Sequence, residues 1–305
     1  MPTFDHLLRD VQAEWRQSND KPDESPETTL RALWFAAIGR SCSEAAVGME
    51  RALPPLDPDS TKRLRELIRR RRDGEPLAYL TGWQRFLGID LRCDGRALIP
   101  RRETELLARA AIENARHHVD TRGRALVLDV CTGTGNVALA IAAHVEGVMV
   151  YAADLSPDAV ALAQWNATEL GLAQRVFFRT GELFAAFDGM ALDGSVDLVT
   201  CNPPYIPSSR VQALPREIAA FEPMGAFDGG TLGMDILMAL IGQAPRLLRA
   251  GGALCVEVGR GQAPFVRRRM ERSGRYAAIE ELLDESGDTR VLRATAAGPV
   301  AAHTS

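Results

Sequence analysis

A buried strand that ends in two consecutive prolines constrains the fold of this chain more than any other feature. Val196 to Cys201 is a short, mostly apolar run, typical of a strand covered on both faces of a parallel sheet. The prolines of Asn202-Pro203-Pro204-Tyr205 lack backbone N–H groups, so they stop the strand and begin a stiff loop. Such a loop leaves the Asn202 amide and the Pro203 carbonyl free to accept hydrogen bonds, with the ring of Tyr205 beside them. It predicts a site for a planar group that carries an NH2, although a structural proline-rich turn would look the same.

An earlier strand, turn and helix supply a second candidate site. Ala125 to Val130 reads as a buried strand and Asn136 to about Val145 as a helix. This order brings backbone N–H groups and a helix N-terminus to a ligand. The spacing excludes a phosphate-binding Gly-x-x-x-x-Gly-Lys loop and does not match the dinucleotide Gly-x-Gly-x-x-Gly pattern. The turn between strand and helix consists of Cys131, Thr132, Gly133, Thr134 and Gly135.

The next two strands add polar residues at their carboxyl ends. Val148 to Ala153 ends on Asp154, where a carboxylate can accept hydrogen bonds from both hydroxyls of a ribose. Val176 to Thr180 is followed by Glu182 and Leu183, which could flank an adenine. Each feature alone has an ordinary structural explanation, but their order along successive strands favours one shared nucleoside-bearing ligand.

Composition excludes several classes of function. The 305 residues are 46% hydrophobic and 25% charged with a net charge of −4, so no global basic field exists for gripping nucleic acid. The five cysteines form no Cys-x-x-Cys pair, which argues against a zinc site and a disulfide framework. No long apolar span or signal peptide is present in the sequence. We therefore expect a cytoplasmic protein in a reduced setting, without a metal or a membrane partner.

Changes in texture along the chain predict its domains. Residues 1–74 read as a small helical domain, 75–100 as a connector or hairpin, 101–296 as an α/β domain, and 297–305 as a frayed tail. The four arginines from Arg69 to Arg72 fit either a solvated helix end or a patch for an acidic partner or RNA. Further elements are expected as helices over 103–115, 233–250 and from 264, a strand over 253–258, and a closing hairpin of 279–283 with 290–294.

Taken together, these motifs resemble the class I S-adenosylmethionine-dependent methyltransferases, and more narrowly the HemK-type protein-glutamine N5-methyltransferases. The resemblance covers residues 75 to 295 and also fits a helical N-terminal domain. Besides the two loops and Asp154, it is carried by Pro76–Gly82 with Phe86, Leu98–Arg101 with Thr104 and Glu105, and Phe221–Pro223.

The resemblance implies a Rossmann-like methyltransferase sheet with helices on both faces. S-adenosylmethionine (SAM) would be bound by residues 131–135, Asp154, Glu182, Leu183 and Asn202. The acceptor glutamine would bind at Asn202, Pro203, Pro204 and Tyr205, with Asn202, Pro203 and Tyr205 serving catalysis.

The protein that carries this glutamine stays open at the level of sequence. Cys131 resembles the branch that modifies ribosomal protein L3, whereas Arg102-Glu-Thr-Glu105 resembles the branch that modifies peptide chain release factors. The release factor is the preferred substrate and L3 the alternative. Asn-Pro-Pro-Tyr also marks adenine-N6 nucleic-acid methyltransferases, but the net acidity argues against them and against sequence-specific nucleic-acid binding. A non-catalytic SAM-binding module is a third reading, which the intact acceptor motif and Asp154 oppose.

Overall fold

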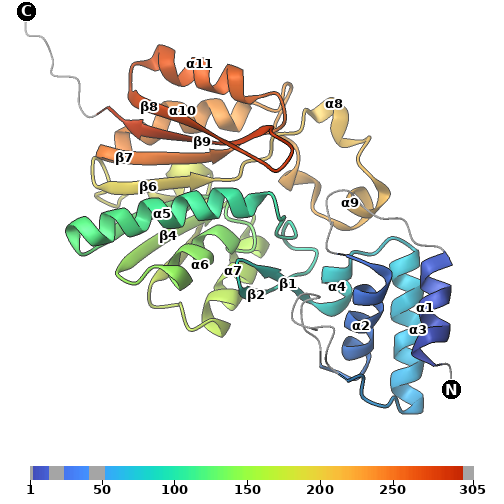
Figure 1. Ribbon diagram of the computed structural model, residues 1–305. Helices are drawn as coiled ribbons and strands as arrows, with labels where there is room; N and C mark the ends of the chain where they lie inside the picture. Colours follow the sequence, from blue (N-terminus) through green and yellow to red (C-terminus); the bar gives the residue numbers. More distant parts are fainter. Residues whose placement is uncertain (1–2, 14–23, 41–51, 298–305) are drawn as a thin grey trace, which may run out of the picture. The chain divides into compact units, whose positions relative to one another are not determined.

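A computed structural model describes residues 3–13, 24–40 and 52–297 of the chain (Figure 1). The chain divides into two compact units, which are described separately: Met1–Arg102 with Leu214–Pro223, and Glu103–Ala213 with Met224–Ser305. Cys42, one of the five cysteines, and the predicted tail beyond Ala297 lie outside the described residues.

The first unit contains the predicted small helical domain. Helices α1 (Phe4–Ala13), α2 (Pro26–Ala37), α3 (Pro58–Arg72) and α4 (Leu77–Thr81) pack around one apolar cluster. The starts of α2 and α3 follow from capping, because the Ser25 and Asp57 side chains accept hydrogen bonds from the N–H groups of Thr28 and Ser60. The cluster includes residues 77 and 80 of α4, so it extends beyond the predicted boundary at 74.

The arginine run at the end of α3 is paired within the first unit. Arg69 bridges Glu66 and Asp73, and Arg70 pairs with Glu75. Arg71 lies between the carboxylates of residues 24 and 217, and Arg72 donates to a backbone carbonyl of α1. These partners favour a structural role for the four arginines at the end of the helix over a basic patch that binds an acidic partner or RNA.

After α4 the first unit continues as the predicted hairpin, with β1 (Trp83–Phe86) antiparallel to β2 (Ile89–Arg92). Two motifs of the family resemblance meet here through a buried ion pair. Arg101 Nη2 lies 2.5 Å from Oε1 of Glu222, which follows α9 (Arg216–Phe221), and the Ile99 N–H donates to the other carboxylate oxygen. Because these groups are buried, loss of one partner would leave an uncompensated charge. The pair therefore fixes residues 99–101 against the distant 214–223 segment.

The second unit confirms the predicted Rossmann-like α/β sheet with helices on both faces. Its order is β5-β4-β3-β6-β7-β9-β8. Strands β3 to β7 are parallel, and β9 runs antiparallel to both β7 and β8. The strands are β3 (Ala125–Val130), β4 (Val148–Asp154), β5 (Val176–Thr180), β6 (Val196–Cys201), β7 (Leu248–Glu257), β8 (Tyr276–Leu283) and β9 (Thr289–Ala296). The strand order reverses between β3 and β6, where open α/β sheets bind ligands at their carboxyl ends.

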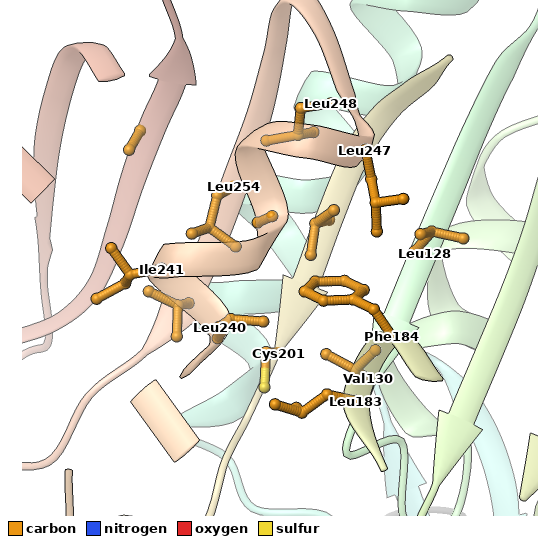
Figure 2. Packing of buried hydrophobic residues seen from close by; sticks show 14 of the residues in the cluster. Leu128, Val130, Leu183, Phe184, Cys201, Leu240, Ile241, Leu247, Leu248 and Leu254 are labelled. Carbon is orange, nitrogen blue, oxygen red and sulfur yellow. The ribbon is translucent and has the colours of Figure 1, made fainter. Parts of the chain in front are cut away.

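One large apolar cluster of the second unit lies on one face of this sheet. The 3-10 helix η2 (Leu183–Phe187), α10 (Asp235–Leu247) and α11 (Ala263–Ser273) supply apolar side chains that meet alternate residues of β3, β6, β7 and β9. Figure 2 shows Phe184 and Leu183 packed beside Val130 and Cys201. The intervening strand residues point to the opposite face. Helix α5 (Thr104–Arg122) lies across β3, β6 and β7 on that face (Figure 1).

The remaining elements connect the strands. They are α6 (Asn136–His144), α7 (Pro157–Glu169), α8 (Ser208–Val211) and the short η3 (Met224–Ala226). Some predicted limits are wrong. Helix α5 continues past Ala115 until Gly123, whose left-handed backbone ends it. Strand β7 begins at Leu248 and not at Ala253, because Leu248 already pairs with Val196 before an irregularity in the register.

Candidate active site

The turn after β3 is shaped by three residues with left-handed backbone. Cys131, Gly133 and Gly135 have φ of 59°, 54° and 82°. A side chain in this region costs on the order of 1–2 kcal/mol, so Cys131 occupies a position that glycine would fit without strain. A Cβ on Gly135 would come within 3.0 Å of Leu139, whereas a Cβ on Gly133 would meet no atom within 4 Å. Gly135 therefore serves packing, and Gly133 faces open space that a ligand can use.

Asp129 supports this turn from below. Its two carboxylate oxygens accept hydrogen bonds of 2.6 Å from the hydroxyls of Thr132 in the turn and Thr200 in β6. Burial raises the pKa of Asp129 to about 6, although the two hydroxyls partly oppose the shift. This carboxyl group therefore ties the turn to the strand that precedes Asn202.

Asp154 lies directly beside the turn, as the sequence-based hypothesis requires. One carboxylate oxygen accepts from the Gly133 N–H at 2.8 Å and the other from the Ser156 N–H at 2.9 Å. Burial raises the pKa of Asp154, and these backbone donors counteract it. The Thr134 hydroxyl is buried without a hydrogen-bond partner among the described residues. A half-buried carboxylate, an open glycine and a buried hydroxyl without a partner therefore occur together in the region where the sequence analysis expects the cofactor.

The two residues predicted to flank adenine differ in their surroundings. Both follow β5, whose end is joined to β4 by the Gly181 N–H and the Asp154 carbonyl, 2.9 Å apart. Leu183 has a φ of 44° and is only 8% exposed, and its side chain packs in the apolar cluster of Figure 2. Glu182 is exposed. Leu183 therefore mainly fixes the start of η2, and Glu182 is the better placed of the two for a ligand.

Asn202 stands at the carboxyl end of β6, next to the end of β3. Its side chain is half-buried and Nδ2 donates to the Thr104 hydroxyl of α5 at 3.1 Å. Among the described residues, no group donates a hydrogen bond to Asn202 Oδ1 or to the Pro203 carbonyl. Two neutral acceptors in consecutive residues are therefore without a donor in the described part of the chain.

The sequence predicts Tyr205 as an aromatic ring beside the two acceptors, but the structure also engages its hydroxyl group in hydrogen bonds. Its hydroxyl lies 3.5 Å from Glu257 Oε1 in β7 and accepts from Arg290 Nη2 in β9 at 3.2 Å. Burial, followed by the charge of Glu257, raises the pKa of Tyr205 above its ordinary range. Burial therefore keeps the phenol a neutral hydroxyl, and its oxygen lies between Glu257 and Arg290.

The backbone of residues 204–206 is held by a glycine-rich segment over 228–233. Added Cβ atoms would come within 2.5 Å of the Pro204 carbonyl at Gly229 and within 2.2 Å of the Tyr205 carbonyl at Gly233. Gln262 Nε2 donates to the carbonyls of both Tyr205 and Gly233. Only glycine permits this close approach, so the segment fixes the path of the loop after Asn202.

Sequence reasoning missed several residues that hold this site. Glu257 and Arg290 lie in the predicted strands 253–258 and 290–294, where a charged residue beside apolar neighbours was the available signal. Gln262 and Thr200 carried no signal that could be recognised locally. Their partners are 57 and 71 residues away along the chain.

The described part of the chain adds two negative findings. None of its helices has the length and apolar character needed to cross a membrane. No cluster of histidine, cysteine and acidic side chains capable of holding a metal ion occurs within residues 3–13, 24–40 and 52–297.

Comparison with protein-family models gives two matches. Residues 7–82 match the family described as the PrmC N-terminal domain, and residues 127–223 match a methyltransferase domain. These matches show a SAM-dependent methyltransferase, and the turn and Asp154 described above fit that cofactor.

Curated relatives cover nearly the whole chain. The release factor glutamine methyltransferase of Rhodopirellula baltica is 34% identical over 274 residues, which are 89% of this chain and 90% of the relative. The enzyme of the same name from Geobacter sulfurreducens is 38% identical over 273 residues, 90% of each chain. Among solved structures, human methyltransferase 10 domain containing protein aligns with a TM-score of 0.50 at 16% identity, covering 70% of this chain and 90% of that one. The last similarity bears on the fold alone.

Proposed function

This chain belongs to the family of release factor glutamine methyltransferases, and from that premise we propose that it methylates the side-chain amide nitrogen, N5, of a glutamine in a peptide chain release factor. The observation that carries the proposal is the orientation of Asn202. Its Nδ2 is engaged by Thr104, so Oδ1 and the carbonyl of the next residue, Pro203, are two acceptors that receive no hydrogen bond within the described part of the chain. The choice of substrate is supported by relatives that are named release factor glutamine methyltransferase and that this chain matches over most of their length.

The cofactor-binding residues are proposed to be the 131–135 turn with Asp154, and Glu182 at the adenine end. SAM supplies a methyl group bonded to a sulfonium, which is already a good electrophile. The open face of Gly133 admits the cofactor close to the backbone, and the Asp154 carboxylate is placed to accept from the ribose hydroxyls. The enzyme's remaining task is to position the acceptor.

An amide nitrogen is a poor nucleophile because its lone pair is delocalised into the carbonyl. If Asn202 Oδ1 and the Pro203 carbonyl each accept one hydrogen of the glutamine NH2, the nitrogen is held in one orientation and its desolvation is compensated. Positioning of this kind can supply on the order of 7–11 kcal/mol of the barrier. No strong base is needed before attack, and the surplus proton leaves the methylated nitrogen for water.

The helical first unit is proposed to recognise the protein substrate, since the methyltransferase site is built by the second unit alone. A release factor as substrate also implies a cytoplasmic setting. Cys131 is the residue of this site that resembles the branch acting on ribosomal protein L3, so L3 and an adenine acceptor both serve as comparison substrates.

The test is single-turnover methyl transfer from labelled, saturating SAM to release factor, ribosomal protein L3 and DNA, run in parallel. We expect label on the release factor, at a glutamine. Asn202→Ala should fold and bind SAM but transfer about 10²–10³ times more slowly, because the amide loses one preorganised contact. Asn114→Ala is the matched control, since Asn114 is another half-buried asparagine, on α5. Transfer by Asn202→Ala within threefold of the parent would reject the role of Asn202, and preferred labelling of L3 or DNA would reject the substrate.

A further inference from the structure

Gln262 lies between β7 and α11, directly before the first residue of that helix, and both ends of its side-chain amide are hydrogen-bonded. Its Oε1 accepts from the Gly259 N–H at 2.8 Å. Its Nε2 donates to the Tyr205 carbonyl at 3.0 Å and to the Gly233 carbonyl at 3.1 Å. One side chain therefore joins three pieces of backbone: the chain after β7, the glycine-rich segment, and the acceptor loop (Asn202–Tyr205).

The partners of Gln262 determine which way its amide points. A backbone N–H can only donate a hydrogen bond, and a backbone carbonyl can only accept one. Reversing the amide would set Oε1 against two carbonyls and the NH2 group against an N–H, so all of its hydrogen bonds would be lost. Among the described residues, no other group donates to the carbonyl of Tyr205 or of Gly233. Gln262 is therefore the single donor that both carbonyls have in this part of the chain.

The ring of Tyr205 lies close to the same amide. A Cβ added to Gly259 would come within 2.9 Å of Gln262 Oε1 and within 3.0 Å of Tyr205 Cδ2. At the other end of the ring, the Tyr205 hydroxyl accepts from Arg290 Nη2 at 3.2 Å. Tyr205 is therefore anchored twice, at its carbonyl by Gln262 and at its hydroxyl by Arg290.

A short, stiff piece of chain links the Tyr205 carbonyl to the two acceptors. Only Pro204 separates Tyr205 from Pro203, whose carbonyl is one of these acceptors. Because the proline rings fix φ at both 203 and 204, few torsions remain that could absorb a shift of Tyr205. A displacement of Tyr205 is therefore passed on to the Pro203 carbonyl and toward Asn202.

We propose that Gln262 is a positioning residue for methyl transfer, which anchors Tyr205 and thereby sets the place of the Pro203 carbonyl. The inference rests on the proposed function, because it assumes that Asn202 and Pro203 bind the glutamine NH2. Gln262 makes no hydrogen bond with either acceptor, so it acts through the loop. Within the described residues it also makes none with the 131–135 turn, so SAM binding should not depend on it.

The first test is single-turnover methyl transfer to a release factor, with SAM saturating. Gln262→Glu keeps the shape but turns an oxygen toward the two carbonyls, and Gln262→Met keeps the length without hydrogen bonds. Transfer should fall about 10–10²-fold in both, as expected for a displaced acceptor, while the Kd for SAM from calorimetry stays within about twofold. Gln243→Glu is the matched control, because Gln243 is an exposed glutamine on α10, and it should leave transfer unchanged. Folded Gln262 variants that transfer at the parent's rate overturn the proposal.

A double-mutant cycle with Asn202→Ala distinguishes positioning from a general loss of structure. Once Asn202 is alanine, the pair of acceptors is already broken, so Gln262→Met should cost at least about threefold less in rate than it does in the parent. An equal loss in both backgrounds would mean that Gln262 supports only the fold, and it would overturn the proposal. Should thermal unfolding show that neither Gln262→Met nor Gln262→Glu folds, Gln262→Asn takes their place in the cycle, because its amide is too short to reach all of its partners.

The outcomes separate this inference from the proposed function. A parent that leaves the release factor unlabelled, or a fully active Asn202→Ala variant, rejects the function itself. An active parent with an impaired Asn202→Ala variant, but with unimpaired Gln262 variants, rejects only the role of Gln262.

Discussion

Replacing Asp154 with alanine removes a carboxylate that has two separable tasks. In the protein alone it accepts from the Gly133 and Ser156 N–H groups at 2.8 and 2.9 Å. With SAM bound, we expect it to accept from two ribose hydroxyls as well. Since a hydrogen bond to a charged group is worth roughly 1.5–3 kcal/mol, complete loss of both would weaken binding by about 3–6 kcal/mol. Asp154 is half-buried and water can replace part of this, so we expect a loss near the lower limit, about 10²-fold in Kd.

The measurement is calorimetric titration with SAM, accompanied by thermal unfolding of the variant without ligand. Asp154→Asn keeps one oxygen acceptor and should lie between the parent and the alanine variant. Asp158→Ala removes the same charge from an exposed position in the first turn of α7 and should leave the affinity unchanged. A folded Asp154→Ala variant that binds SAM within threefold of the parent would remove Asp154 from the cofactor site.

Two further predictions concern residues around the acceptor loop. Burial raises the pKa of Glu257 from 4.5 to about 7, so the folded state holds this proton more tightly than the unfolded chain. The stabilisation is complete below pH 4.5 and is lost by about pH 7. Over this window, denaturant unfolding should show that the parent loses roughly 3 kcal/mol of unfolding free energy relative to Glu257→Gln. Parallel plots of unfolding free energy against pH for the two proteins would contradict the pKa shift. Gly233→Ala should abolish most transfer and spare SAM binding, because its Cβ would lie 2.2 Å from the Tyr205 carbonyl. Gly251→Ala has the same positive φ but open space, so equal transfer rates for the two alanine variants would show that the contact with Tyr205 is unimportant.

Much of the second unit could be predicted from local pattern. The strands at 125–130, 176–180 and 196–201 have the expected limits, because each is a mainly apolar run that is followed by a turn. Their polar ends also came together as expected, since the carboxyl ends of parallel strands share one edge of a sheet. The turn at 131–135 and Asp154 are therefore neighbours for a reason that is visible in the sequence.

Local sequence pattern was less informative where contacts with distant residues determine where an element begins or which way a side chain points. Strand β7 includes Gly251 and Gly252, which would ordinarily end a strand, because Leu248 pairs with Val196 ahead of them. Leu183 follows a strand end as a ligand-binding residue would, but its positive φ directs it into the core. The start of β7 and the orientation of the Leu183 side chain are therefore not set by local sequence. Each depends on the residues that pack or pair with it in the folded chain.

The sequence by itself determined that a buried strand ends before Asn202 and that a stiff loop with hydrogen-bond acceptors follows. Only the tertiary structure decided which way the amide of Asn202 points. Thr104 is 98 residues away, and Tyr205 reaches Glu257 and Arg290 across 52 and 85 residues. These groups meet because the strand order places β6 beside β7 and β7 beside β9, with α5 laid across them. Local preferences set where strands begin and end, but hydrogen-bond partners so distant in the chain are fixed only when the strands take their order in the sheet.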